Sequence, residues 1–267
     1  MNSFTPDHRP ERPDISLTEA TVSGYGFVKD NYHTLLKWAV IPIVLNFFTY
    51  LVIDWQVPEG STLTTFLVSV PATAAFAWYV FVQTRLQVFD EALGDLSADE
   101  SYRLRRRDDA VLSISCYILF QMAATLIMFA LSGSMEMEVG DTLSPDQMVR
   151  VGLGLFLFFY ILKYGVVHLV AAVDGDILDY LKRVKGMWFS FVLVGAGFVS
   201  TLPVLLLFMF LLSFIAPGAS SAEGLENNAR LSIYAFGTIM SWAVTMILNA
   251  CLVDVLRQLY QKKTGRS

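Results

Sequence analysis

The sequence has 267 residues, of which 55% are hydrophobic and only 16% are charged. A soluble domain carries about 25% charged residues, and one with this composition could not keep its apolar surface away from water. The formal net charge of −5 argues against nucleic acid as a partner, because a protein that neutralises phosphates needs a basic face. The composition therefore indicates the lipid bilayer as the partner of most of the chain.

Six apolar segments follow one another along the chain, each long enough to cross a hydrocarbon core of about 30 Å as a helix. Each segment is continuously apolar, whereas a strand of a membrane barrel would alternate apolar and polar residues. The predicted fold is therefore all-α, a polytopic transmembrane helical bundle that occupies residues 34–260. Its six spans cover about residues 35–54, 62–84, 110–132, 149–172, 187–215 and 231–254.

The residues before the first span carry helical signals of their own. Ser16 and Glu19 have the spacing of a capping box, in which the serine side chain and the glutamate satisfy exposed N–H groups reciprocally. Apolar residues follow at helical spacing, so residues 15–33 are predicted to form an amphipathic interfacial helix, one of several short cytoplasmic amphipathic helices. Gly24 and Gly26 weaken this helix by about 1 kcal/mol each relative to alanine.

The distribution of basic residues predicts the orientation. Of the 19 Lys and Arg residues, 16 fall on the side that holds both termini, the loop after the second span and the loop after the fourth span. The opposite side holds only Arg150 and Arg230. By the positive-inside rule, both termini are predicted to be cytoplasmic. Residues 1–14 are then a disordered cytoplasmic tail, and residues 261–267 are a second, short tail.

Arg105, Arg106 and Arg107 stand immediately before the third span. A basic cluster in this place holds the cytoplasmic end of a span and attracts anionic lipid, at about 1 kcal/mol per residue near the surface. These three arginines are therefore predicted to be topology and lipid-contact anchors.

Lys163 and His168 are the two ionisable residues that fall well inside a span. A charge at the bilayer centre costs about 2.5–3.5 kcal/mol or more, so such residues commonly have a function. One interpretation is a proton or substrate relay, with Tyr160 and Tyr164 on an adjoining stripe of the same helix. The other is that the Lys163 ammonium reaches the cytoplasmic interface along its apolar stem, with His168 already interfacial. Both residues are candidate functional polar residues.

Three aspartates, Asp174, Asp176 and Asp179, lie together after the fourth span. Carboxylates grouped at a membrane surface could hold Mg²⁺. A basic stretch, residues 182–185, follows at once and favours solvated charge pairs instead. The two cysteines lie in apolar runs, without the Cys and His spacing of a zinc site. The sequence therefore predicts no metal and no cofactor.

An aspartate also stands where each even-numbered span ends, at Asp90, Asp174 and Asp254. A leucine-bearing amphipathic stretch follows each of them. One interpretation is a repeat of three helical hairpins, each returning to the cytoplasm through a short interfacial helix. The other is that any helix that leaves a membrane ends at a charge.

Two segments carry a resemblance to a known family. Ile15–Ile43 contains an amphipathic stretch with an aromatic-rich turn into a Pro-containing span, and Leu252–Tyr260 closes the last span. The chain resembles a group of six-span bacterial membrane proteins, including the membrane domain attached to some glycerophosphodiester phosphodiesterases. The resemblance implies a multi-pass protein of the bacterial inner membrane. The printed sequence contains no phosphodiesterase domain, so that chemistry is not expected here.

No catalytic motif stands out in the sequence, which has no P-loop, GxSxG, HExxH or kinase-like set. The favoured function is therefore that of a non-enzymatic scaffold, assembly or regulatory component, acting on a membrane or cytoplasmic protein partner. The alternative is a small transporter or channel with a polar path near Lys163 and His168. A lipid-modifying enzyme that uses the three aspartates after the fourth span is a third hypothesis.

Overall fold

A computed structural model describes residues 15–57, 62–91, 100–132, 145–215 and 227–261. The regular structure in these ranges is entirely helical. Six helical segments are long and apolar enough to cross a membrane. The prediction of an all-α, six-span, multi-pass membrane protein is thus confirmed. The predicted tail of residues 1–14, and residues 262–267 of the second tail, lie outside the described part of the chain.

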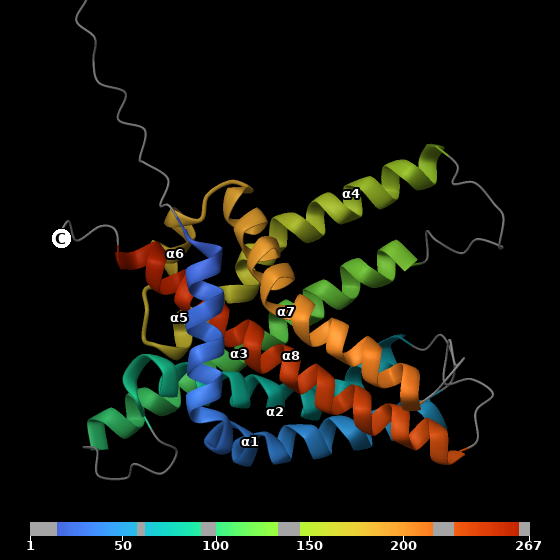
Figure 1. Ribbon diagram of the computed structural model, residues 1–267. Coiled ribbons are helices and arrows are strands. Elements are labelled where there is room, and N and C mark those ends of the chain that lie inside the picture. The colour runs from blue at the N-terminus through green and yellow to red at the C-terminus, as the bar shows by residue number, and fades with distance from the viewer. Residues whose placement is uncertain (1–14, 58–61, 92–99, 133–144, 216–226, 262–267) are drawn as a thin grey trace, which may run out of the picture.

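In Figure 1 the long helices fan out towards the right, where α3 and α4 rise and α7 and α8 descend. Their bounds are α1 Leu17–Gln56, α2 Thr62–Phe89, α3 Glu100–Ser132, α4 Pro145–Ile161, the 3-10 helix η1 Leu162–Val166, α5 Val167–Ala172, α6 Ile177–Arg183, α7 Trp188–Ile215 and α8 Asn227–Gln261. The start of α1, the end of α8 and the short helix α6 gather at the same end of the bundle, at the left of Figure 1. We refer to it as the α6 end.

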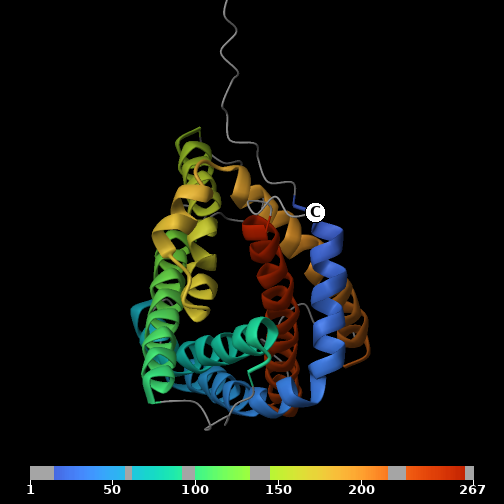
Figure 2. The same ribbon diagram turned by 90° about the vertical axis from the view of Figure 1, so that its left-hand side faces the viewer.

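The first helix, α1, joins the predicted interfacial helix and the predicted first span without a break. Its first part crosses the α6 end steeply, and the rest turns to run beside α2 (Figures 1 and 2). The Ser16 hydroxyl caps the helix by accepting from the Glu19 N–H at 3.3 Å, as the capping-box spacing predicts. The Ser16 N–H in turn donates to Oε1 of Gln258 at 2.7 Å, which fastens the start of α1 to the end of α8.

Close packing between α1 and α8 explains why a predicted surface helix contains glycine. A Cβ atom on Gly24 would meet the Sγ and the backbone nitrogen of Cys251 at 2.7 and 2.8 Å, so the helices touch where this residue has no side chain. One residue later, the Tyr25 hydroxyl donates to the carbonyl of Ser200 in α7 at 2.7 Å. The first part of α1 is therefore bound to both α7 and α8.

The buried core lies in the half of the bundle near the α6 end. Leu35, Tyr79, Leu169, Tyr180 and Phe189 are almost fully buried there. Towards the opposite end, large apolar side chains of α4 and α7 face outwards, as expected of helices in contact with lipid. Examples are Leu153, Phe156, Leu206 and Phe214.

Several helices continue past the predicted span ends on the side of the α6 end. The second span was expected to stop at residue 84, yet α2 runs on to Phe89 with Arg85 inside it. Likewise α8 extends to Gln261, and α3 begins at Glu100 rather than near residue 110. These extensions carry charged residues, so the helices continue beyond the apolar runs that define the predicted spans.

Candidate functional site

The fourth span is interrupted where its candidate functional residues lie. α4 ends at Ile161, and the 3-10 segment η1 separates it from α5. Short 3-10 stretches inside a longer helix often mark a hinge, and interrupted spans line the substrate sites of several transporter folds. Gly165 lies in the interruption, where a Cβ atom would come within 2.7 Å of the Phe120 ring of α3. The missing side chain thus lets α3 approach the break.

Lys163 is buried in this structure, with 2% of its surface exposed. Its ammonium donates to the carbonyl of Gly186 at 3.0 Å and lies 3.8 Å from the ring centre of Tyr160. The Tyr180 hydroxyl, whose pKa is raised by burial, donates to the Lys163 carbonyl oxygen. The ammonium is therefore held by the loop between α6 and α7, and by an aromatic face.

His168 lies five residues later, in a different environment. Its side chain is 7% exposed, and its ring meets the Tyr117 ring edge-on with the centroids 5.0 Å apart. Ser113 Oγ donates to the His168 carbonyl at 2.9 Å, which ties α5 to α3. The Nδ1 atom is buried, and the polar group beside it is the backbone carbonyl of Gly165, one turn earlier. Lys163 and His168 therefore do not form one site.

A cavity of about 370 Å³ lies beside His168, among α2, α3, η1, α5, α7 and α8. We call it the His168 cavity. Most of its wall is apolar, and no Lys, Arg, Asp or Glu occurs among the described residues that line it. Its polar lining residues are Tyr117, Gln121, His168, Thr245 and Asn249.

A second cavity, of about 270 Å³, lies further from the α6 end, among α1, α2, α3 and α8. We call it the polar cavity, because hydroxyl and amide side chains dominate its wall and its described lining again lacks a charged residue. Tyr117, Gln121 and Thr245 line both cavities, so the two adjoin. The remaining polar lining residues are Asn46, Tyr50, Ser69, Thr73 and Ser241.

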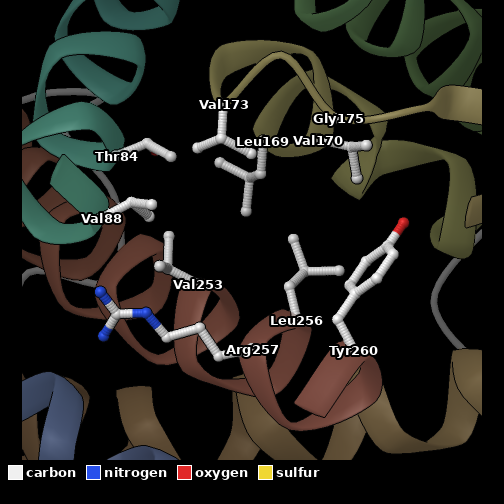
Figure 3. A pocket seen from close by; sticks show the side chains of 10 residues that line it. All are labelled: Thr84, Val88, Leu169, Val170, Val173, Gly175, Val253, Leu256, Arg257 and Tyr260. Atoms are coloured by element: carbon white, nitrogen blue, oxygen red, sulfur yellow. The ribbon is translucent and has the colours of Figure 1, made fainter. Parts of the chain in front are cut away.

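A third cavity, of about 220 Å³, lies at the α6 end among α2, α5 and α8 (Figure 3). We call it the aliphatic cavity. Asn249, which lines the His168 cavity, donates through Nδ2 to Thr84 Oγ1 at 3.3 Å, and Thr84 lines the aliphatic cavity. This hydrogen-bonded pair stands between the two spaces.

An ion-pair network surrounds Arg85 of α2, which is only 4% exposed. Its Nε lies 2.6 Å from Glu91, and one terminal nitrogen lies 3.1 Å from Asp109 of α3. The same terminal nitrogen donates to the Ala172 carbonyl at the end of α5, and the other donates to the Tyr102 hydroxyl. A buried charge is tolerated only when it is paired and hydrogen-bonded. The network therefore joins α2, α3 and α5 while compensating the guanidinium.

The three predicted arginine anchors separate in the structure. Arg106 belongs to the network, with its Nε 2.8 Å from the second oxygen of Glu91. Arg105 is exposed, and Arg107 is exposed beside Asp108 at 3.4 Å. Only Arg105 and Arg107 are thus placed as side chains that face the surroundings of the bundle.

A polar seam also joins α2 to α8. Gln83 and Gln87, one turn apart, donate through Nε2 to the backbone carbonyls of Met246 and Ala250 at 2.7 and 2.9 Å. Arg257 donates to the Gln87 carbonyl, which continues the seam towards the α6 end. Such contacts satisfy polar groups away from water and fix the register of the two helices.

The three aspartates after the fourth span serve separate purposes. Asp176 caps α6, accepting from the N–H groups of Leu178 and Asp179 at 2.8 and 3.2 Å. Asp179 pairs with Arg183 at 2.7 Å. Asp174 adopts a φ of 55°, in the left-handed region. Among the described residues, no group of three or more His, Cys, Asp or Glu side chains is placed to hold a metal.

Of the three aspartates that follow the even-numbered spans, Asp90 and Asp174 have the same backbone conformation. Asp90 follows α2 with a φ of 54°, which matches the 55° of Asp174. Each donates its N–H back to a carbonyl of the preceding turn, Leu86 or Ala171. Asp254 differs, because it lies inside α8 and pairs with an arginine three residues later. Two of the three aspartates therefore share a helix-ending role.

Sequence reasoning missed the Arg85 network and the Gln83–Gln87 seam. The signal was present: two glutamines at i and i+4 flank an arginine in an apolar context. Gln83 and Gln87 lie on one helix face and Arg85 on another, and polar groups within a membrane bundle need partners on neighbouring helices. Arg85 directly follows the predicted second span, so hydropathy alone indicates a charge that ends an apolar run.

Comparisons of the chain with protein-family models, with curated proteins and with solved structures find no match. The functional argument therefore depends on the residues and geometry described above.

Proposed function

We propose that this multi-pass membrane protein is a small transporter or channel for an uncharged solute. The observation that carries the proposal is the pair of adjoining cavities between the helices, one of which is lined by His168. Tyr117, Gln121 and Thr245, which line both cavities, would contact a solute that passes between them. Of the two sequence-based candidates, only His168 lines this path.

The absence of charge in the described lining favours an uncharged solute. Moving an ion into a low-dielectric interior requires a counter-charge or many ordered dipoles. The lining offers instead an imidazole, amides and hydroxyl groups beside apolar walls. This set fits a small molecule that has both hydrogen-bonding groups and an apolar part.

The interruption of the fourth span supports movement at this site. Because η1 lacks the α-helical hydrogen-bond ladder, α5 with His168 can shift relative to α4 at lower cost than within an unbroken helix. A transporter needs such a joint to open the path at one end and close it at the other.

The test is solute flux into lipid vesicles that contain the purified protein. Glycerol, urea and small amides serve as uncharged probes, and Na⁺ and acetate serve as charged ones. His168→Phe and Gln121→Leu should abolish uncharged-solute flux. The exposed histidine variant His33→Phe provides the matched control and should keep it. Equal flux in all three variants, or no flux above that of empty vesicles, would contradict the proposal.

A non-enzymatic scaffold, assembly or regulatory component remains the second candidate, and one observation favours it. Only 6% of the most apolar stretch of α3 is buried within the chain. Leu119 and Leu126 are both exposed on that helix, and a membrane-protein partner would cover them there. A photoreactive residue at Leu119 should then capture one specific partner in intact membranes, whereas capture of lipid alone would exclude a partner at this face.

The proposal includes the orientation of the chain in the membrane and the identity of that membrane. The excess of basic residues on the side of the termini supports cytoplasmic termini, and the bacterial inner membrane is where the family resemblance would place the chain. A reporter fused after Glu138 should be found outside the cytoplasm, and a reporter fused after Ser267 should be found in the cytoplasm. The opposite result would overturn this orientation, and with it the direction of the proposed path.

A further inference from the structure

We propose that the aliphatic cavity binds one acyl chain of a phospholipid, drawn from the leaflet that the α6 end meets. The cavity is separate from the proposed solute path, since the Thr84–Asn249 pair stands between them. It lies near the ends of α2, α5 and α8 on the side of the α6 end. Figure 3 shows the side chains that line it.

The wall of the cavity is a hydrocarbon surface. Val88 of α2, Leu169 at the middle of α5 and Val253 and Leu256 of α8 point into the space from different sides (Figure 3). A smaller engineered cavity of about 150 Å³ with such a wall stays dry and takes up benzene or xenon. At about 220 Å³, this space suits a hydrocarbon chain and offers water few partners.

Two hydrogen-bond donors lie at the rim. Arg257 is partly exposed and donates to Asp254 Oδ1 at 3.0 Å and to the Gln87 carbonyl, while a guanidinium has five N–H donors. The Tyr260 hydroxyl is buried without a hydrogen-bond partner among the described residues. An ester carbonyl and a phosphate would satisfy such a tyrosine hydroxyl and such a guanidinium.

The depth of the cavity selects a membrane lipid as the occupant. Val88 stands one residue before the end of α2, and Val173 directly follows α5, so the cavity lies at the level where the apolar runs give way to charge. The Arg183 guanidinium, which pairs with Asp179, lies 4.6 Å from the centre of the Tyr260 ring beside the rim. Acyl chains, esters and phosphates meet at this level of a bilayer.

The test uses the full-length protein in nanodiscs of phosphatidylglycerol that has a photoreactive group along one acyl chain. Light should attach the lipid to residues around the cavity, such as Val88, Val173 and Leu256. Val253→Phe fills the space, so that the acyl chain buries about two fewer methylene groups in the cavity. Attachment there should therefore fall about tenfold. Val199→Phe, on an exposed face of α7, is the matched control and should leave it unchanged.

Several outcomes would overturn the proposal. Attachment spread evenly over exposed faces would mean ordinary bilayer contact, and equal attachment in both phenylalanine variants would mean that the cavity is not occupied. Photoreactive free fatty acid supplied in place of the phospholipid should label the cavity much less; equal labelling would make a free fatty acid the occupant instead. Should Val253→Phe fail to fold, Val88→Phe fills the same space from α2.

Discussion

Gly24 of α1 packs on the backbone of Cys251 of α8 at a distance that leaves no room for a side chain. A Cβ atom there would lie 2.8 Å from the Cys251 nitrogen and 3.0 Å from its Cα. Gly26 lies two residues further along, on the other side of the same helix. A Cβ atom added there would have no heavy atom of a neighbouring element within 4 Å. The two glycines thus have the same helix propensity but opposite packing environments.

Replacing these glycines one at a time should therefore have opposite effects. Gly24→Ala forces α1 away from α8, and we expect it to lower the free energy of unfolding by roughly 1–3 kcal/mol. Gly26→Ala adds helix propensity without a clash and should raise it by up to about 1 kcal/mol. Thermal unfolding in detergent measures both. Equal effects of the two substitutions would show that α1 does not touch α8 as described.

Removing the buried guanidinium of Arg85 should damage the protein severely. Arg85→Ala removes the arginine that pairs with Asp109 and one of the two that pair with Glu91, and breaking a buried ion pair costs about 3–5 kcal/mol. Arg107→Ala removes an exposed arginine, whose pair with Asp108 is worth about 0–1 kcal/mol. The amount of folded protein in the membrane, together with its unfolding temperature, distinguishes these cases. A mild Arg85→Ala phenotype would mean that the network contributes little.

Lys163 should behave as a structural residue. Lys163→Met keeps most of the stem but removes the ammonium from the Gly186 carbonyl and from the Tyr160 ring, with a loss of about 2 kcal/mol. Flux per folded molecule should remain that of the unsubstituted protein, because Lys163 does not line the proposed path. Loss of flux without loss of stability would show that Lys163 takes part in transport, contrary to this prediction.

The acidic stretch after the fourth span offers a test between helix capping and metal binding. Asp176→Ala removes the cap of α6 and should cost about 1 kcal/mol. Asp174→Gly should be neutral or slightly stabilising, because glycine adopts the left-handed conformation without strain. Unfolding temperatures should be the same with and without Mg²⁺ in both variants and in the parent. A Mg²⁺-dependent rise in the parent, lost in both variants, would show a metal site instead.

Much of the fold could be predicted because the bilayer makes hydropathy and helix length decisive. Six runs of adequate length became six membrane-length helical segments, and the spacing of Ser16 and Glu19 marked the start of α1. The burial of Arg85 could not be predicted in the same way, because its partners come 6 and 24 positions later in the sequence. Local pattern does not reveal such distant partners.

The site was only partly predictable for a related reason. Lys163 and His168 looked equivalent because both interrupt the same apolar run. Their difference depends on the 3-10 break between α4 and α5 and on which neighbouring helices each side chain meets. The His168 ring packs on Tyr117 of α3, whereas Lys163 reaches the loop before α7. Those neighbours are set by tertiary packing, which a single sequence does not disclose.

The continuity of α1 makes its first part a lever on the interior of the protein. That part is tied to α8 at Gln258 and Cys251, and α8 supplies wall residues to all three cavities. Any displacement of α8 that widens a cavity must therefore tilt the first part of α1 or break the contacts between that part and α8. Conversely, lateral tension in the adjoining leaflet, acting on this segment, would be transmitted to the walls of the proposed path.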